Sequence, residues 1–414
     1  MSYSRQRRAE QPGRRSSGGA TAQRSRYGSR PQQRFQRPTK SKKPAKQYIH
    51  HSKFIQAAKQ RQTVAYVPNY RFSDFAVDSL IHRNLAAMGF EQPSPIQDQA
   101  IPVALLGQDV VGIANTGTGK TAAFAIPVLD KLMHDRTSKV IILAPTRELA
   151  QQIEDQCRLI GKGSGLFGVL LIGGVAMGPQ IRDLAHNPQI IVGTPGRVKD
   201  HIQRGTLDLS NCNLVVLDEV DRMLDMGFVH DITQILSETK ADRQSLYFSA
   251  TLDKRVKGII DSFSKDPVYI SVKQGETSDN VEQDVVFYTD KTDKIDRLHT
   301  LLNADGLTKV IIFDDTQRSV ERLSKELIAR GFSAGSIHGG KTQAQRQKML
   351  DKFKSSHVKV LVSTDVAARG LDVDDISHVV NFSTPQTYDD YVHRIGRTGR
   401  ANKTGFAYTF VESK

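Results

Sequence analysis

Short apolar runs alternate with longer amphipathic stretches along most of the chain. The runs of the first half lie at 110–113, 140–144, 169–172, 190–192, 214–217, 246–248 and 268–271. A second set follows at 285–288, 310–313, 334–337, 358–362, 378–381 and 405–409. Continuous apolar segments of this length are typical of buried parallel strands, and the stretches between them are typical of crossover helices. Because the polar stretch 275–280 separates the two sets, the pattern predicts two doubly wound α/β domains on a flexible linker.

The N-terminal segment differs from the rest in composition and charge. Residues 1–51 carry ten Arg and four Lys against the single acid Glu10, a net charge of +13 out of +14 for the whole chain. Residues 1–47 contain few aliphatic side chains and cannot bury enough apolar surface to offset chain entropy, which predicts a disordered basic tail. The tail either anchors nucleic acid, with aromatic residues available for stacking, or is a solvated, dispensable extension.

Cysteine usage and hydropathy restrict the class of protein. Cys157 and Cys212 are the only two cysteines, which argues against a disulfide scaffold and favours a reducing compartment. No apolar stretch approaches the roughly 18 residues of a membrane span, and the basic N-terminus lacks the apolar core of a signal peptide. We therefore expect a cytoplasmic protein without a membrane partner.

A glycine-rich loop follows the apolar run 110–113. Its residues are Thr116, Gly117, Thr118, Gly119, Lys120 and Thr121. Such glycines let the backbone aim N–H groups at phosphate oxygens, at the start of a predicted helix whose dipole favours anions. In this pattern Lys120 reaches the β- and γ-phosphates and the Thr121 hydroxyl coordinates Mg²⁺. A glycine-rich turn that binds no nucleotide is the alternative, and the strand–loop–helix order disfavours it.

Two acidic residues end the apolar run 214–217. Asp218 is suited to hold Mg²⁺ through water, and Glu219 is suited to orient and deprotonate an attacking water. A solvated acidic turn is the alternative, but a phosphate loop in the same chain disfavours it. The arginine-rich segment 393–400 could reach the same phosphates only if two domains close.

From Phe72 to its last residues the chain resembles the DEAD-box RNA helicases of superfamily 2. Besides the two motifs above, the resemblance rests on Gly89–Phe90 with Pro93–Gln97, Pro145–Ala150, Gly173–Gly174, Thr194–Arg197, Ser249–Thr251, Gln343 with Arg346, Ser363–Asp372 and His393–Arg400. This ordered set implies two RecA-like parallel-sheet domains, ATP and Mg²⁺ as cofactors, and RNA as the partner.

The resemblance also implies roles for residues that would meet ATP. Phe72 would stack on adenine, and the Gln97 amide would offer its edge a donor and an acceptor. Asp372 would lie at the ribose, and Gly370 would belong to the same nucleotide-binding set. The catalytic set would comprise Lys120, Asp218, Glu219, His393 and two arginine fingers, Arg397 and Arg400.

The implied RNA contacts are made to the backbone. They involve Pro145, Arg147, Gly173, Gly174, Thr194, Gly196, Arg197, Gln343, Arg346 and Thr364. Contacts to phosphates fix register without reading bases, and a preference for RNA would come from 2′-hydroxyl contacts and A-form shape.

The sequence departs from the family pattern at three places, one of which is the acid pair Asp314–Asp315 just after the run 310–313, which would either weaken RNA binding or bind a partner. Val220 stands where the family name motif has Ala, and we expect this change to be tolerated. The chain reaches Lys414 soon after its last apolar run, where family members usually carry a further helix. What covers that part of the second domain is left open.

The function we expect is RNA-stimulated ATP hydrolysis coupled to domain closure, with local, non-processive unwinding of short duplexes or remodelling of ribonucleoprotein. Such an enzyme would act as a monomer, with ribosomal or ribonucleoprotein partners. Two rivals are a DNA-directed superfamily 2 translocase and a non-unwinding RNA clamp or annealing chaperone. The expected organisation is a tail at 1–47, a connector at 48–71, a first domain at 72–272, a hinge at 273–282 and a second domain at 283–414.

Overall fold

The computed structural model describes residues 49–58, 66–115, 117–272, 280–368, 373, 375–399 and 403–413. The predicted basic tail and most of the predicted hinge lie outside these ranges. Within them, no helix is both long and apolar enough to cross a membrane.

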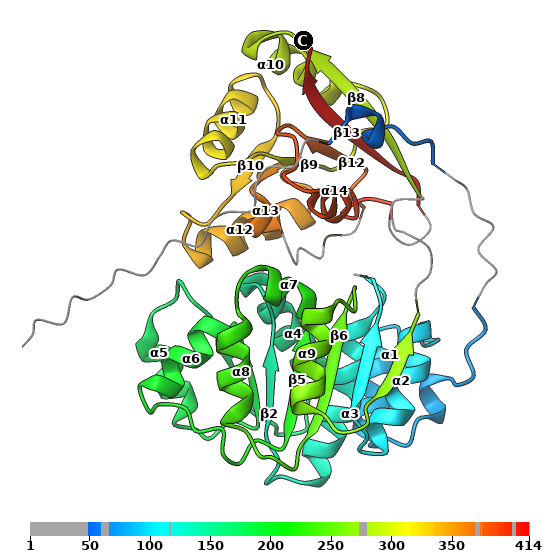
Figure 1. The fold of residues 1–414 in the computed structure, drawn as a ribbon, viewed down its shortest axis with the longest axis vertical. Coiled ribbons are helices and arrows are strands. Elements are labelled where there is room, and N and C mark those ends of the chain that lie inside the picture. Colours follow the sequence, from blue (N-terminus) through cyan, green and yellow to red (C-terminus); the bar gives the residue numbers. More distant parts are fainter. Residues whose placement is uncertain are drawn as a thin grey trace, which may run out of the picture. The chain divides into compact units, whose positions relative to one another are not determined.

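Seven of the described strands form the first sheet (Figure 1), in the order β3-β4-β2-β5-β6-β1-β7. They are β1 (Val110–Ile113), β2 (Val140–Leu143), β3 (Gly168–Leu171), β4 (Ile190–Gly193), β5 (Leu214–Asp218), β6 (Gln244–Ser249) and β7 (Val268–Ser271). Every pairing is parallel. The carboxyl ends of all strands therefore meet at one edge, where open α/β sheets place their sites.

Helices cover both faces of this sheet because neighbouring strand residues point to opposite sides. Along β2, for example, Val140 and Ile142 enter one core and Ile141 and Leu143 enter the other. The helical segments are η2 (Phe72–Asp74), α1 (Ser79–Ala87), α2 (Pro95–Leu105), α3 (Lys120–His134), α4 (Arg147–Ile160), α5 (Met177–Leu184), α6 (Pro195–Gln203), α7 (Val220–Asp225), α8 (Val229–Ser237) and α9 (Lys254–Phe263). Side chains of α1–α4 pack in the first core, and side chains of α6–α9 pack in the second.

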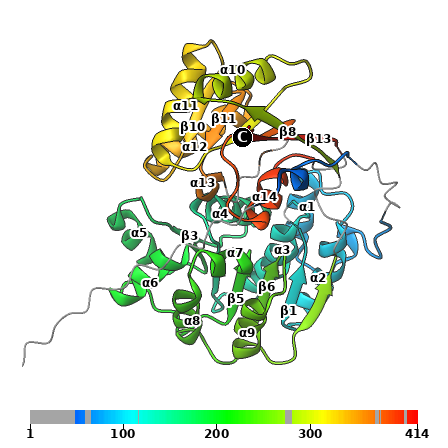
Figure 2. The same cartoon turned by 45° about the horizontal axis from the view of Figure 1, so that its top comes forward.

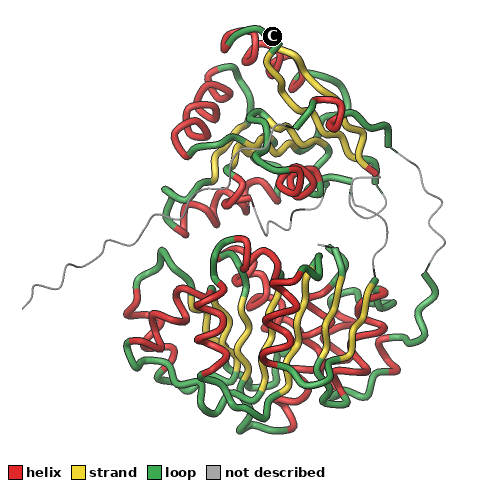
Figure 3. The backbone as a smooth tube through the Cα atoms, viewed as in Figure 1, coloured by secondary structure: helices red, strands yellow, loops and turns green. Residues whose placement is uncertain are grey.

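The second sheet, yellow in the upper part of Figure 3, has the order β10-β11-β9-β12-β13-β8 among the described residues. Its strands are β8 (Val281–Tyr288), β9 (Val310–Phe313), β10 (Ala334–Ile337), β11 (Val360–Ser363), β12 (His378–Asn381) and β13 (Gly405–Glu412). The helices are α10 (Lys291–Leu302), α11 (Gln317–Ala329), α12 (Gln343–Lys354), α13 (Asp365–Ala368) and α14 (Tyr388–Ile395). Side chains of α10 and α11 pack on one face, and side chains of α12–α14 pack on the other. The predicted fold class, two doubly wound parallel-sheet domains, is confirmed.

The edge strand β8 begins earlier than its apolar run indicated. Val281 and Gln283 are buried whereas Glu282 and Asp284 are exposed, so this part of the strand alternates. An edge strand with one covered face reads as alternating rather than continuously apolar, which hid these residues from the sequence pattern. Residues 281 and 282, predicted as the end of the hinge, therefore belong to the strand.

The predicted connector contains a short 3₁₀-helix, η1 (His51–Phe54), followed by extended residues as far as 58. Ile49 and Phe54 join the core of the second domain on the face of α12–α14. The N-terminal segment thus contributes to the core of the second domain.

Candidate active site

The phosphate loop connects β1 to α3 at the carboxyl edge of the first sheet. Gly117 and Gly119 have φ of +79° and +87°, left-handed conformations that favour glycine. Lys120 begins α3, is almost fully buried, and its Nζ donates to the carbonyl oxygen of Ala114 at 2.8 Å. The loop is therefore preshaped, with backbone N–H groups and one ammonium at a helix N-terminus that suits an anion.

Gln97, in the first turn of α2, holds the loop from outside. Its Nε2 donates to the Gly119 oxygen at 3.0 Å, and its Oε1 accepts from the Ser94 N–H at 2.8 Å. The Ser94 hydroxyl donates to the Thr118 oxygen at 2.7 Å. A Cβ at Gly119 would lie 2.4 Å from Gln97 Nε2, so glycine is needed for this close approach. Both ends of the amide are engaged with its own chain, and its contact with adenine stays a prediction.

Phe72 lies in an aromatic cluster beside this helix. Its ring is only 5% exposed and packs edge-on against Phe75 and Phe90, with ring centroids 5.9 and 5.3 Å away. Packing in this aromatic cluster thus accounts for much of the buried surface of the Phe72 ring. Its stacking on adenine stays a prediction.

Asp98, a residue that the sequence analysis did not single out, anchors the segment before Phe72. Its carboxylate accepts from the Tyr66 hydroxyl at 2.5 Å and from the Asn69 and Tyr70 N–H groups at 3.0 Å each. Burial acts to raise the pKa of Asp98, but these hydrogen bonds outweigh it and lower the pKa. This ionised anchor contributes stability above the ordinary Asp pKa of about 3.9 and loses it as pH falls through the lowered value.

The acidic strand end brings two carboxylates next to the loop lysine. Asp218 ends β5, and Glu219 follows with φ 53° and ψ 54°, a left-handed conformation that costs a non-glycine residue about 1–3 kcal/mol. Glu219 Oε2 lies 3.3 Å from Arg222 Nη1. Burial raises the pKa of Asp218, against the opposing effect of Lys120. Burial also acts to raise the pKa of Glu219, but Arg222 and Lys120 outweigh it and the pKa is lowered. Glu219 is therefore held ionised, the state that a general base needs.

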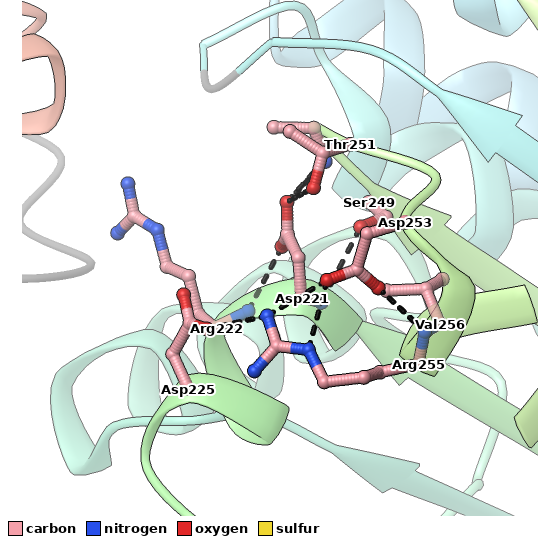
Figure 4. A network of polar contacts seen from close by, with 9 residues as sticks. Asp221, Arg222, Asp225, Ser249, Thr251, Asp253, Arg255 and Val256 are labelled. Carbon is pink, nitrogen blue, oxygen red and sulfur yellow. Dashed lines mark hydrogen bonds and ion pairs between the residues drawn. The ribbon is translucent and has the colours of Figure 1, made fainter. Parts of the chain in front are cut away.

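Asp221 joins this strand end to the loop after β6 (Figure 4). Its Oδ2 accepts from the N–H groups of Ala250 and Thr251 at 3.1 and 2.9 Å, and from the Thr251 hydroxyl at 3.0 Å. Its own N–H donates to the Ser249 hydroxyl at 3.3 Å. One buried carboxylate thus fixes two loops from adjacent strands. The sequence analysis assigned Asp221 no role, although its place three residues after Asp218 was a usable signal.

Val220 lies between these acids and points into the core. Its side chain is fully buried with residues of β5, α8 and α9. The carboxylates on either side make the polar contacts described above, so valine is accommodated by core packing.

A second group of predicted residues lies around the loops after β2, β3 and β4. Arg147 begins α4, and its guanidinium lies against Gly173 and Gly174. Arg197 in α6 donates to the Val175 oxygen at 3.1 Å. Six of the seven RNA contacts predicted in these loops line one pocket, namely Pro145, Arg147, Gly173, Thr194, Gly196 and Arg197; Gly174 lies against Arg147 instead. The pocket thus combines two guanidinium groups with glycine backbone, which suits a phosphodiester chain.

Substituting Gly174 tests this pocket. An added Cβ would lie 2.1 Å from Arg147 Nη1, and the glycine has φ +74°. Gly174→Ala should therefore displace the guanidinium and lower single-stranded RNA affinity about tenfold, the effect of losing one charge-assisted contact. Fluorescence anisotropy with a labelled oligonucleotide measures it.

The matched control for backbone strain is Gly205→Ala. Gly205 has a similar φ of +66° but open space around its Cβ, so RNA affinity should stay within about twofold of wild type. An equal loss of RNA affinity in Gly174→Ala and Gly205→Ala would show that Arg147 does not contact RNA.

The second domain places Gln343, Arg346 and Thr364 in segments that follow the carboxyl ends of β10 and β11. Gln343 begins α12 with Arg346 in its first turn, and Thr364 lies between β11 and α13. His393 lies in α14, and Arg397 follows it, almost fully buried, with its Nε donating to the His393 oxygen at 3.3 Å. Thr116, Gly370, Asp372 and Arg400 lie outside the described residues, so nothing is added to their predicted roles.

Arg394 is a buried residue of this segment that the sequence analysis passed over. Its side chain donates to both carboxylate oxygens of Asp365 at 2.6 and 2.8 Å, and to the Ser383 oxygen at 2.7 Å. Its guanidinium carbon lies 5.2 Å from the centroid of the Phe313 ring. Arg394 thus ties α14 to α13, to the end of β9 and to the loop after β12.

The sequence matches protein-family models and resembles known proteins. Residues 94–259 match the DEAD/DEAH box helicase family, and residues 293–402 match the helicase conserved C-terminal domain. The chain is 47% identical over 344 residues to the DEAD-box ATP-dependent RNA helicase CshA of Bacillus licheniformis, covering 82% of this chain and 70% of that protein. Its identity to CshA of Bacillus subtilis is also 47% over 344 residues, covering 82% and 69%.

Solved structures resemble the fold as well. S. cerevisiae Dbp5 bound to RNA and ADP BeF3 matches with a TM-score of 0.73 and 31% identity, covering 83% of this chain and 90% of that one. Mss116p bound to single-stranded RNA and AMP-PNP also gives a TM-score of 0.73, at 29% identity, covering 84% and 77%.

Proposed function

Because this chain belongs to the DEAD-box ATP-dependent RNA helicases, we propose that it couples ATP hydrolysis to closure of its two domains on RNA and to local, non-processive strand separation. Use of ATP and action on RNA follow from the family. The coupling mechanism is our proposal. Its main support is Asp221, because this carboxylate connects the acidic strand end directly to the loop after β6. A change at the γ-phosphate can therefore shift that loop without passing through the hydrophobic core.

In the first domain, ATP would lie along the phosphate loop with its γ-phosphate near Glu219. Lys120 would exchange its hydrogen bond to Ala114 for the phosphates, and Glu219 would accept a proton from the attacking water. Thr121 and Asp218 would hold Mg²⁺, which would neutralise charge on the phosphates. Two protein ligands are enough for this ion, because Mg²⁺ bound to a nucleotide is also coordinated by water molecules and phosphate oxygens. The described residues contain no cluster of three or more His, Cys, Asp or Glu that could hold a metal ion.

The second domain would complete the site on closure. Arg397 and Arg400 would stabilise charge on the transferring phosphoryl group, an effect of about 10³–10⁵ in rate where such fingers act. His393 would lie near the γ-phosphate, Asp372 would lie at the ribose, and Gly370 would contribute to nucleotide binding. Because these groups belong to a different sheet from the phosphate loop, hydrolysis would depend on what brings the domains together.

RNA would bind through its backbone and promote this closure. The pocket with Arg147 and Arg197 would take the strand in the first domain, and Gln343, Arg346 and Thr364 would take it in the second. Recognition would be largely independent of sequence, and the enzyme would act as a monomer on short duplexes or on ribonucleoprotein.

Steady-state ATP hydrolysis with no nucleic acid, single-stranded RNA or matched single-stranded DNA tests the proposal. We expect strong stimulation by RNA alone. Equal stimulation by DNA would favour a translocase, and RNA binding without stimulated turnover would favour a clamp or annealing chaperone.

The role of the basic tail is tested by deleting residues 1–47. Each backbone phosphate neutralised on single-stranded RNA adds about 0.7 to the log–log slope of affinity against salt. We expect the deletion to lower RNA affinity and to flatten that slope by at least about 1.4, equivalent to two phosphates. A full-length variant with the ten tail arginines replaced by Gln should behave in the same way. An unchanged slope in both would show that the tail neutralises no phosphates.

A further inference from the structure

Residues His50–Gln56, which precede the first domain in sequence, pack on the second domain. Phe54 has no exposed surface, and its ring centroid lies 4.7 Å from that of Tyr391 in α14, at an interplanar angle of 58°. In Figures 1 and 2 the segment is the short blue helix beside β8 and β13. Phe54 is thus a core residue of a domain that begins more than two hundred positions later in the chain.

The backbone of this segment also pairs with the second sheet. The Gln56 N–H donates to the Gln283 oxygen at 3.0 Å, and the Gln283 N–H donates back to the Gln56 oxygen at 2.8 Å, an antiparallel bridge. β8 is an edge strand of the sheet, and its other side pairs with β13. The bridge therefore engages an edge that would otherwise be open to another chain.

Gln283 links this bridge to helix α14. Its side-chain oxygen accepts from the Tyr391 hydroxyl at 2.8 Å while its backbone pairs with Gln56. Tyr391 is therefore fixed at both ends, at its ring by Phe54 and at its hydroxyl by Gln283. Two further contacts flank them: His51 meets the Phe287 ring edge-on at 5.6 Å, and Lys53 Nζ lies 5.9 Å from the centroid of the Tyr388 ring.

The same helix carries the catalytic segment of the proposed mechanism. His393 is two residues after Tyr391, and Arg397 follows the helix with its Nε hydrogen-bonded to the His393 oxygen. The contacts of Tyr391, together with those of Arg394, therefore help to set where this segment lies. A displacement of α14 would move the guanidinium of Arg397, and catalysis is sensitive to displacements of about 1 Å.

We propose that residues His50–Gln56 form a strap that fixes α14, and that Phe54 is a positioning residue for ATP hydrolysis through Tyr391. This inference rests on the proposed function in one respect, the role of Arg397 in turnover. The strap would keep the arginine segment ordered before ATP and RNA arrive. Opening of the strap would leave ATP binding intact, because the phosphate loop belongs to the first domain, but would slow hydrolysis.

Phe54→Ala in the full chain tests the strap by two independent measurements. Amide hydrogen exchange, followed by mass spectrometry, should be at least about tenfold faster in α14, because the helix loses a buried partner. The kcat of RNA-stimulated ATP hydrolysis should fall about tenfold while the KM for ATP changes less than about twofold, as expected for an interaction that acts only in the transition state. Phe54→Leu should largely restore both the slow amide exchange of α14 and the kcat, because leucine keeps most of the buried side-chain volume.

Ile55→Ala is the matched control, because the neighbouring side chain is 53% exposed. It should leave exchange and kcat at the wild-type values. Should Phe54→Ala fail to fold, Gln56→Pro removes the N–H that pairs with Gln283 without opening a cavity, and should also accelerate exchange in α14.

If amide hydrogen exchange in α14 is unchanged in both Phe54→Ala and Gln56→Pro, the proposal that the strap fixes this helix is wrong. Faster exchange with an unchanged kcat would overturn the positioning role of Phe54. If the wild-type chain shows no RNA-stimulated hydrolysis, the proposed function fails, whereas the exchange measurement still decides whether the strap holds α14.

Discussion

Replacing Glu219 by Gln should lower the kcat of RNA-stimulated ATP hydrolysis by about 10²–10⁴, the usual contribution of a general base. The side chain is buried, and Arg222 and Lys120 keep the carboxyl ionised. An amide of the same shape cannot accept the proton of the attacking water. Binding of ATP and RNA should persist, because neither the phosphate loop nor the pocket around Arg147 is changed. Single-turnover hydrolysis and equilibrium binding, measured in parallel, separate the two effects.

The control for this change is Glu238→Gln, the same substitution at an exposed position at the end of α8. It should leave kcat within about twofold, as expected for a surface substitution away from the site. A Glu219→Gln enzyme with wild-type kcat would remove Glu219 from the role of base. Lost ATP binding would instead assign it to the nucleotide pocket.

Replacing Arg394 by Met should destabilise the second domain by about 3–5 kcal/mol, because it leaves a partly buried carboxylate without its partner. The guanidinium is 1% exposed and satisfies both oxygens of Asp365 and the Ser383 carbonyl. Methionine fills part of the space but donates no hydrogen bond. At an m-value of about 2 kcal/mol/M, the urea midpoint of the second domain should fall by about 2 M.

Arg255→Met provides the comparison on the surface. Arg255 also contacts two carboxylates, those of Asp225 and Asp253 (Figure 4). Its side chain, however, is 54% exposed. Because solvent screens such exposed ion pairs, Arg255→Met should lower the free energy of unfolding by less than about 1 kcal/mol. A similar loss of stability in Arg394→Met and Arg255→Met would mean that burial does not strengthen the Arg394 contact.

The sequence by itself determined the two parallel sheets, the phosphate loop and the acidic strand end. Each is local: continuous apolar runs specify buried parallel strands, and paired glycines before Lys120 specify the turn that starts a helix. The largest error in strand length is at the start of the edge strand β8, because one-sided burial gives it an alternating pattern; β6 and β13 are also longer than their apolar runs. The family resemblance then named the remaining predicted site residues, among them Arg147 and Arg397.

The tertiary structure alone decided which side chains meet. Asp221 reaches the loop after β6, Gln97 supports Gly119, Arg394 binds Asp365, and Phe54 enters the second domain. None of these pairs is close in sequence. Each depends on which strands are neighbours in the sheet or on where a distant segment packs, and hydrophobic periodicity carries no information about either. Sequence pattern therefore specified the elements, and three-dimensional packing specified the polar contacts that connect them.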